Sequence, residues 1–279
     1  MGKSQDMGVP ALPAGELSQK GRKVLPTHYL SGKTFRVFGS DNSREHPYVV
    51  PVTNRQMDFF KRLFNRQPLT LASLAFDAPG WQVQETNLKK QVWEHPGHSA
   101  VLSLPFFAVP PDIPVRLDDQ MGLRDHYRSL IHTQHGGLVE VAVGVLANTR
   151  INVVKTIFKV PRQPRGMGYI GSLTVPFKHC SYVVKIQAEE AGMTGMREAV
   201  IADKLIREGK IVPGENTILG WSADPYDRNW KKGALMNLAE REEYDPLFPG
   251  HPLTIVRDGL KAVAVSMKLT KELLRAERF

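Results

Sequence analysis

The stretch GLVEVAVGVLANTRINVVKTIFKVPRQPRGMGYIGSLTVPFKHCSYVVKIQAE, residues 137–189, decides the fold. It contains four runs rich in Val, Ile and Phe, at 137–147, 150–160, 168–177 and 181–189. Short segments with Asn, Pro and Gly separate the runs, which is typical of β-strands joined by turns. Because no helical segment lies between them, the strands follow one another directly, and we expect an antiparallel sheet.

The flanking sequence adds further strands and two helices. We expect strands within 71–86, around the Pro79-Gly80 turn, and then at 89–95 and 99–109. The segment 117–137 predicts a helix capped by Asp118 or Asp119, and 194–210 predicts a helix with Thr194 as its N-cap. The fold class is therefore α+β, an antiparallel β-sheet covered by helices.

Composition along the chain suggests four parts. Residues 1–33, rich in Gly, Pro, Ser and Lys, predict a basic extended arm. Residues 34–66 predict lead-in strands and an amphipathic helix, 67–210 the antiparallel sandwich, and 211–279 a C-terminal loop and helical module.

The last segment, from His251 to Phe279, predicts the longest helix of the chain. Apolar side chains recur along it at spacings of three and four residues, until Thr270 interrupts the pattern. Such a stripe packs on the protein's own core or against a helix of a partner. The candidate partner-binding residues here are Leu253, Val256, Leu260, Val263 and Met267.

The formal net charge of +9 is concentrated at the N-terminus. Residues 1–66 hold eleven Lys and Arg against five Asp and Glu, which gives +6 of the +9. An electropositive segment attracts acidic proteins, nucleic-acid backbones or anionic membrane surfaces. The candidate contacts in this segment are Lys20, Arg22, Lys23, Lys33 and Arg36.

The hexapeptide GMGYIG, residues 166–171, has the G-x-G-x-x-G spacing of a dinucleotide-binding turn. That motif needs a helix after the glycines, with its N-terminus aimed at the pyrophosphate. Here SLTVPF follows, which predicts a strand, so we interpret the glycines as turn residues between two antiparallel strands. SGKT at 31–34 lacks the glycine that a phosphate loop needs, because Thr27 stands in its place. No small-molecule cofactor is expected.

A catalytic constellation is not visible in the sequence, and we expect a protein that is not an enzyme. One alternative is a hydrolase-type enzyme whose site lies between the sheet and the His-bearing helix. It would need His126 or His132 to meet Ser172, Asp118 or another acid.

Metal and redox chemistry find little support in the sequence. Histidines 132 and 135 share a helix, and His95 and His98 lie beside Glu94, but no H-E-x-x-H motif occurs. Cys180 is the single cysteine, which excludes an intramolecular disulfide, and its strand context predicts a small buried residue. The first residues lack the apolar region of a signal peptide, so we expect a soluble, cytoplasmic protein.

The order of these elements, with FDAPGW (Phe76 to Trp81) opening the first strands and LRDHYRSL in the first helix, resembles the PsbP/DcrB-like family over about residues 70–208. That family includes extrinsic photosystem proteins, the nuclear import factor Mog and secretion-effector chaperones. The resemblance implies a non-enzymatic fold used mainly to bind other proteins or to stabilise assemblies.

The sequence thus favours a non-catalytic, protein-binding accessory or adaptor subunit of a larger assembly. It would dock through the sandwich, with the basic arm and the terminal helix adding contacts. The alternatives are the hydrolase-type enzyme and an electrostatic binder of nucleic acid or a membrane surface.

Overall fold

The computed structural model describes residues 68–215 and 217–279. The arm at 1–33, with its five candidate contacts, and the lead-in strands and helix at 34–66 lie outside these residues. The described residues belong to one compact unit, in which the C-terminal helix packs on the sheet. The division expected between 67–210 and 211–279 stays a prediction.

The centre of the unit is a seven-stranded antiparallel sheet with the order β2-β3-β4-β8-β7-β6-β5. The four runs that decide the fold are β5 to β8, each paired with the next, as predicted. Strand β4 then pairs with β8 and brings the earlier hairpin into the same sheet. The strands are β2 (Gln82–Thr86), β3 (Lys90–Glu94), β4 (Ala100–Phe107), β5 (Gly137–Val145), β6 (Asn152–Pro161), β7 (Met167–Pro176) and β8 (Ser181–Glu189).

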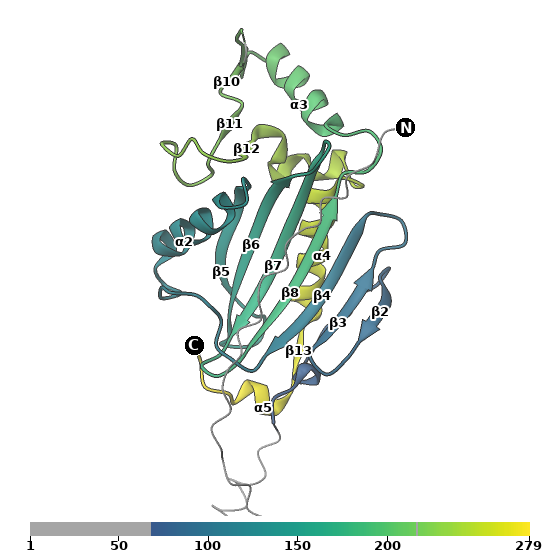
Figure 1. The fold of residues 1–279 in the computed structure, drawn as a ribbon, viewed down its shortest axis with the longest axis vertical. Coiled ribbons are helices and arrows are strands. Elements are labelled where there is room, and N and C mark those ends of the chain that lie inside the picture. The colour runs from purple at the N-terminus through teal and green to yellow at the C-terminus, as the bar shows by residue number, and fades with distance from the viewer. Residues whose placement is uncertain (1–67, 216) are drawn as a thin grey trace, which may run out of the picture. The chain divides into compact units, whose positions relative to one another are not determined.

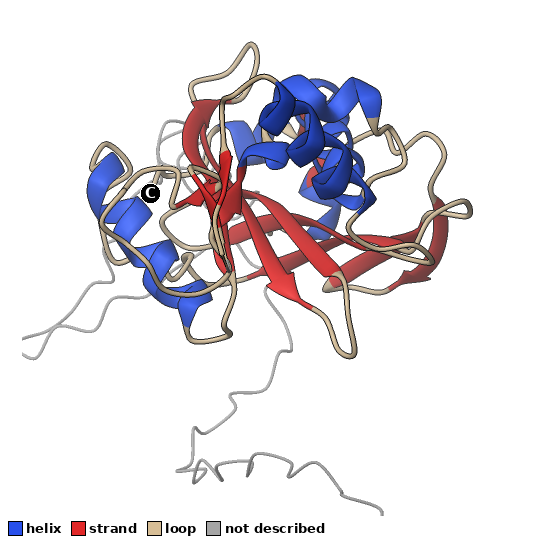
Figure 2. Cartoon of the chain, turned by 90° about the horizontal axis from the view of Figure 1, so that it is seen from above, coloured by secondary structure: helices blue, strands red, loops and turns tan. Residues whose placement is uncertain are grey.

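Helices lie on both sides of this sheet, so the expected α+β architecture is confirmed (Figure 2). Helix α2 (Gln120–His132) packs on β5, and α4 (Pro252–Ser266) packs on β7 and β8 (Figure 1). Side chains alternate between the faces of a strand. On β6, Ile157 accordingly joins the larger core under α4, and Val154 joins the smaller core under α2.

The stripe of the C-terminal helix is part of the protein's own core. Leu253, Val256, Leu260 and Val263 are fully buried in the cluster that α4 forms with β7 and β8. Their prediction as partner-binding residues is wrong, because the sheet of the same chain already covers them. Met267 caps the end of α4 and is half-buried against that core.

The expected single helix from His251 to Phe279 is in fact three elements. Helix α4 ends at Ser266, where Met267 adopts an extended backbone. The chain then forms β13 (Lys268–Leu269), which pairs with β1 (Leu74–Ala75), and α5 (Lys271–Leu274). Thr270, which interrupted the apolar stripe, caps α5 by accepting a hydrogen bond from the Leu273 amide at 3.3 Å.

The GMGYIG glycines have different roles from each other. Gly166 has φ +92° in the turn between β6 and β7, as the turn interpretation requires. Gly168 and Gly171 instead lie inside β7, so the interpretation is wrong for them. A Cβ at Gly171 would lie 2.4 Å from Val256 Cγ1, so this glycine allows α4 to approach the sheet.

Helix α3 and the short strands β10, β11 and β12 lie beyond one end of the sheet (Figure 1). Helix α3 (Met196–Arg207) begins after Gly195, which replaces the expected cap Thr194, while Asp119 caps α2 as predicted. The rest of the chain forms short pieces: η1 (Leu71–Ser73), β9 (Val212–Pro213), β10 (Ile218–Leu219), β11 (Ser222–Ala223), β12 (Met236–Asn237), η2 (Leu238–Glu240) and η3 (Glu242–Leu247). Residues 236–247 of the expected loop and helical module form a short strand followed by two 3-10 turns.

Candidate functional site

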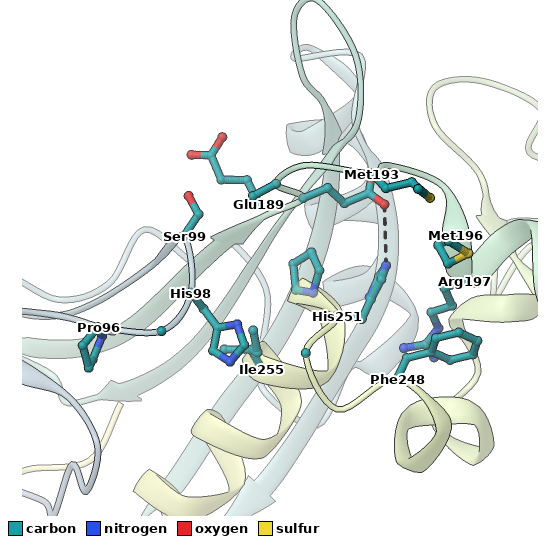
Figure 3. Close-up of a pocket in the computed structure, with 15 residues that line it drawn as sticks. Pro96, His98, Ser99, Glu189, Met193, Met196, Arg197, Phe248, His251 and Ile255 are labelled. Carbon is teal, nitrogen blue, oxygen red and sulfur yellow. Dashed lines mark ion pairs between the residues drawn. The ribbon is translucent and has the colours of Figure 1, made fainter.

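A cavity of about 680 Å³ lies where the β3–β4 turn, the end of β8, the start of α3 and the start of α4 meet. Figure 3 shows His98 from the turn, Met196 and Arg197 from α3, and His251 and Ile255 from α4 around this space. We call it the end cleft. Its lining residues are Pro96, Gly97, His98, Ser99, Glu189, Glu190, Ala191, Met193, Met196, Arg197, Phe248, Gly250, His251, Pro252 and Ile255.

His251 occupies the floor of the end cleft and caps α4. Its Nδ1 accepts a hydrogen bond from the Leu253 amide at 3.2 Å. An amide can only donate, so Nδ1 carries no proton and the proton of the neutral ring sits on Nε2. Nε2 has no hydrogen-bond partner among the described residues and lies 4.0 Å from Glu190 Oε1, the contact drawn as a dashed line in Figure 3.

The His251 ring is held in its neutral form. Burial lowers its pKa to about 3, and the nearby positive charges of Arg197 and Arg257 act in the same direction. The side chain is only 8% exposed. Above about pH 4, His251 is therefore a neutral hydrogen-bond donor through Nε2.

Two carboxyl groups accompany His251, and they differ. Glu190 Oε1 accepts from the Gly195 amide at 2.9 Å and Oε2 from the Met167 amide at 2.8 Å, so it ties β7 to the start of α3. Glu198, in the first turn of α3, has a buried Oε2 without a hydrogen-bond partner among the described residues. Burial, and then the neighbouring Glu190 and Glu240, raise the pKa of Glu198.

A buried ion network supports the cleft from behind. Arg197 donates to Asp245 Oδ1 at 2.8 Å and to the Ala239 carbonyl at 2.6 Å, and Arg257 donates to both Asp245 oxygens. Lys159 and Tyr169 both donate to Glu240, at 2.9 and 2.7 Å. This network joins α3, η2, η3 and α4 to the sheet, and it fixes the positions of the two helix starts.

Glu190, Glu198 and His251 each offer one atom within 4.8 Å of the others, as a divalent-cation site would require. The hydrogen bonding of His251 does not fit such a site. A metal on Nε2 needs an unprotonated Nε2 and a protonated Nδ1, whereas Nδ1 faces the Leu253 amide hydrogen. Metal binding would therefore break the α4 cap.

Two exposed apolar side chains line the cleft. Met193 is 75% exposed and Met196 47% exposed. We call these two methionines the apolar rim. Val200, one turn after Met196 on α3, and Leu247, next to the lining residue Phe248 in the sequence, are exposed as well.

The residues of the hydrolase-type alternative are not brought together by any contact among the described residues. Ser172 Oγ is hydrogen-bonded to Thr156 Oγ1 at 2.8 Å, and Asp118 pairs with Arg116. The His126 ring packs edge-to-face against Tyr127, and the His132 ring packs edge-to-face against Trp230.

His95, His98 and Cys180 are the other residues considered for metal or redox chemistry. The His95 and His98 rings are in contact at a tilt, with centroids 4.7 Å apart, and of the two residues only His98 lines the cleft. Cys180 is buried as predicted, and burial raises the pKa of its thiol, which makes the thiol less reactive.

The sequence analysis did not find the cluster of Glu190, Glu198 and His251, because none of the three belongs to a recognisable motif. The available signal was weak: Met193 and Met196 each follow a glycine, Gly192 and Gly195, in a short segment where methionines have no core to fill.

Comparison with known proteins gives distant similarities. A mutant of the protein Mog1 matches over 47% of this chain and 78% of its own, with 11% identity and a TM-score of 0.31. A protein from Bacteroides thetaiotaomicron matches over 51% and 48%, with 11% identity and a TM-score of 0.26. No family model and no curated protein sequence matches the chain.

Similarity at this level assigns no function, and membership of the PsbP/DcrB-like family stays a proposal. Among the described residues, no helix is long and apolar enough to cross a membrane.

Proposed function

We propose that this chain is a non-catalytic, protein-binding subunit that docks a partner polypeptide at the end cleft. The observation that carries the proposal is the apolar rim: two methionines, 75% and 47% exposed, line a cavity of about 680 Å³. Exposed apolar groups at the edge of a concave site are characteristic of interaction surfaces.

The chemistry of the rim suits a polypeptide partner. Methionine side chains are flexible and polarizable, so they adapt to apolar side chains of differing shape. Phe248 and Ile255 add half-buried apolar surface inside the cleft. The cavity has room for a few side chains of a partner segment, and two helix starts held by the buried network give it a fixed shape.

The basic segment at the N-terminus is the second part of the proposal. With +6 of the net +9, residues 1–66 would speed association with an acidic partner and would make it dependent on salt. Lys20, Arg22, Lys23, Lys33 and Arg36 remain the candidate contacts there.

The test is a comparison of point variants of the full-length protein in affinity purifications from its native cell. Met196→Asp places a charge on the rim, and Val145→Asp places the same charge on an exposed apolar site of β5, far along the fold from the cleft. We expect Met196→Asp to lower the recovery of stoichiometric partners at least tenfold and Val145→Asp to leave it unchanged. Equal recovery with both variants would reject docking at the end cleft.

A further inference from the structure

The side of the sheet opposite α4 is only partly covered by the described elements. Helix α2 packs on this side at β5, and the apolar core beneath it takes its strand residues from β5 and β6, among them Val141 and Val154. In Figure 1, α4 runs behind β7 and β8, and no described helix lies in front of β7, β8 and β4. These three strands therefore have one face that no described helix covers.

Apolar side chains lie on this uncovered face. Residues directly opposite each other on paired strands point to the same side of a sheet. The register places four half-buried residues on the side of Val154: Val92, Val101, Ile170 and Val183. None of the four packs against any of the three apolar cores that the described residues form. We call these four residues, together with Lys185, the open face.

Lys185 lies in the middle of the open face. Ser172 of β7 and Ser103 of β4 are its cross-strand neighbours, and Val183 is the next residue of β8 on the same side. Lys185 is half-buried and forms no hydrogen bond or ion pair with another described residue, whereas both lysines of β6 are ion-paired. The open face therefore combines apolar side chains with one central positive charge.

This combination favours a partner that brings a single negative charge on an apolar surface. A purely apolar partner would remove the Lys185 ammonium from water without a counter-charge, which is costly. A nucleic-acid backbone is bound by several cations, and the apolar residues here surround one. A second copy docked through its own open face would bring two Lys185 side chains together at the symmetry axis.

The width of the uncovered strands fits one helix. Neighbouring strands lie about 4.8 Å apart, so the distance from β7 across β8 to β4 is about 10 Å. An α-helix with its side chains is about 10–12 Å wide. On the opposite side of the sheet, α4 already covers β7 and β8 in this way.

We propose that the open face binds an amphipathic helix of a partner protein, with an Asp or Glu on the apolar side of that helix. The apolar side chains of the helix pack on Val101, Ile170 and Val183, and its carboxylate pairs with Lys185. No residue of the open face lines the end cleft, so this second surface goes beyond the function proposed above.

The experiment is site-specific photo-crosslinking with the full-length protein in its native cell. A photoreactive residue replaces Val101 in one variant and Val265, which is 78% exposed on α4, in the other. Mass spectrometry identifies the crosslinked residue. We expect position 101 to crosslink to one segment whose apolar residues recur every three or four positions, with an Asp or Glu in that stripe.

Charge variants then test the role of Lys185. Lys185→Glu should lower the crosslinking yield from position 101 at least tenfold, whereas Lys185→Arg, which keeps the charge, should stay within twofold. The matched control is Lys261→Glu on the exposed side of α4, which should also stay within twofold. Replacing the acidic residue of the identified segment by Lys should restore crosslinking to Lys185→Glu. Thermal melting verifies that each variant is folded.

The inference is overturned if position 101 gives no crosslink, or crosslinks to residues 1–67 of the same chain, to a second copy, to nucleic acid or lipid, or to a segment without an acidic residue. It is also overturned by the same crosslinks from position 265, or by an unchanged yield with Lys185→Glu. The end cleft is tested separately by Met196→Asp, so the failure of one proposal leaves the other in place.

Discussion

Replacing Gly171 by alanine tests how α4 is held against the sheet. An alanine Cβ at 171 would lie 2.4 Å from Val256 Cγ1 and 2.7 Å from Leu260 Cδ1, where ordinary contact needs about 3.5–4.0 Å. Both neighbours are fully buried side chains of α4, so the helix must move away by about 1 Å. Overpacking of this kind costs about 1–3 kcal/mol.

The matched control is Gly144→Ala in β5, where a Cβ would meet no heavy atom within 4 Å. That variant should be neutral or more stable by up to about 1 kcal/mol, because alanine restricts the unfolded chain. The free energies of unfolding of the two variants should therefore differ by about 1–4 kcal/mol. For a unit of this size, we expect Gly171→Ala to melt about 2–12 °C below the wild type.

Urea denaturation and thermal melting, both followed by circular dichroism, measure these differences. Wild-type stability of Gly171→Ala would refute the close approach of α4 to β7. Equal losses in both variants would show that glycine matters in these strands for a reason other than the helix contact.

Three further predictions follow from the buried groups and the N-terminal arm. Glu240→Gln removes the charge that pairs with the buried Lys159, and the free energy of unfolding should fall by about 3–5 kcal/mol in urea denaturation; a loss below 1 kcal/mol would contradict the buried pairing. The pKa of His251 is about 3 in the folded protein and 6.5 for the free side chain. Between these two pH values the histidine is protonated in the unfolded protein but not in the folded one. The free energy of unfolding should therefore fall by up to about 1.4 kcal/mol per pH unit as the pH drops below 6.5. The variant His251→Asn should lack this dependence of stability on pH. Glu198 acts in the opposite direction, because its raised pKa favours the folded state at low pH, but it is present in both proteins and largely cancels when they are compared. Identical slopes of stability against pH in the two proteins would show that His251 does not have a lowered pKa. Deletion of residues 1–33 should leave the melting temperature within about 2 °C while weakening partner association at low salt, and unchanged association would remove the arm from the proposal.

The sheet could be predicted from the sequence because its signals are local. Each strand of 137–189 carries its own β-branched run and is followed at once by turn residues, so the antiparallel order is visible along the chain. The apolar period of α4 was also visible. A period identifies an apolar face but not the surface that covers it, and the sheet of the same chain covers Leu253 and Val256.

The candidate site could not be predicted, because it depends on contacts between distant segments. Glu190 and His251 are separated by 61 positions, and the end of β8 and the start of α4 bring them together. The tautomer of His251 depends on its cap bond to Leu253, which exists only once α4 begins at Pro252. A histidine in a Pro-Gly turn gives no indication of this in the sequence.

The claim that a partner docks at the end cleft is tested most directly by site-specific photo-crosslinking in the native cell. A photoreactive residue replaces Met193 on the apolar rim in one variant and Leu88, 91% exposed in the β2–β3 turn, in the other. The account predicts crosslinks from position 193 to one or a few defined proteins, lost when Met196→Asp is added, and none to these proteins from position 88. The same crosslinks from both positions, or the absence of crosslinks from position 193, would contradict it.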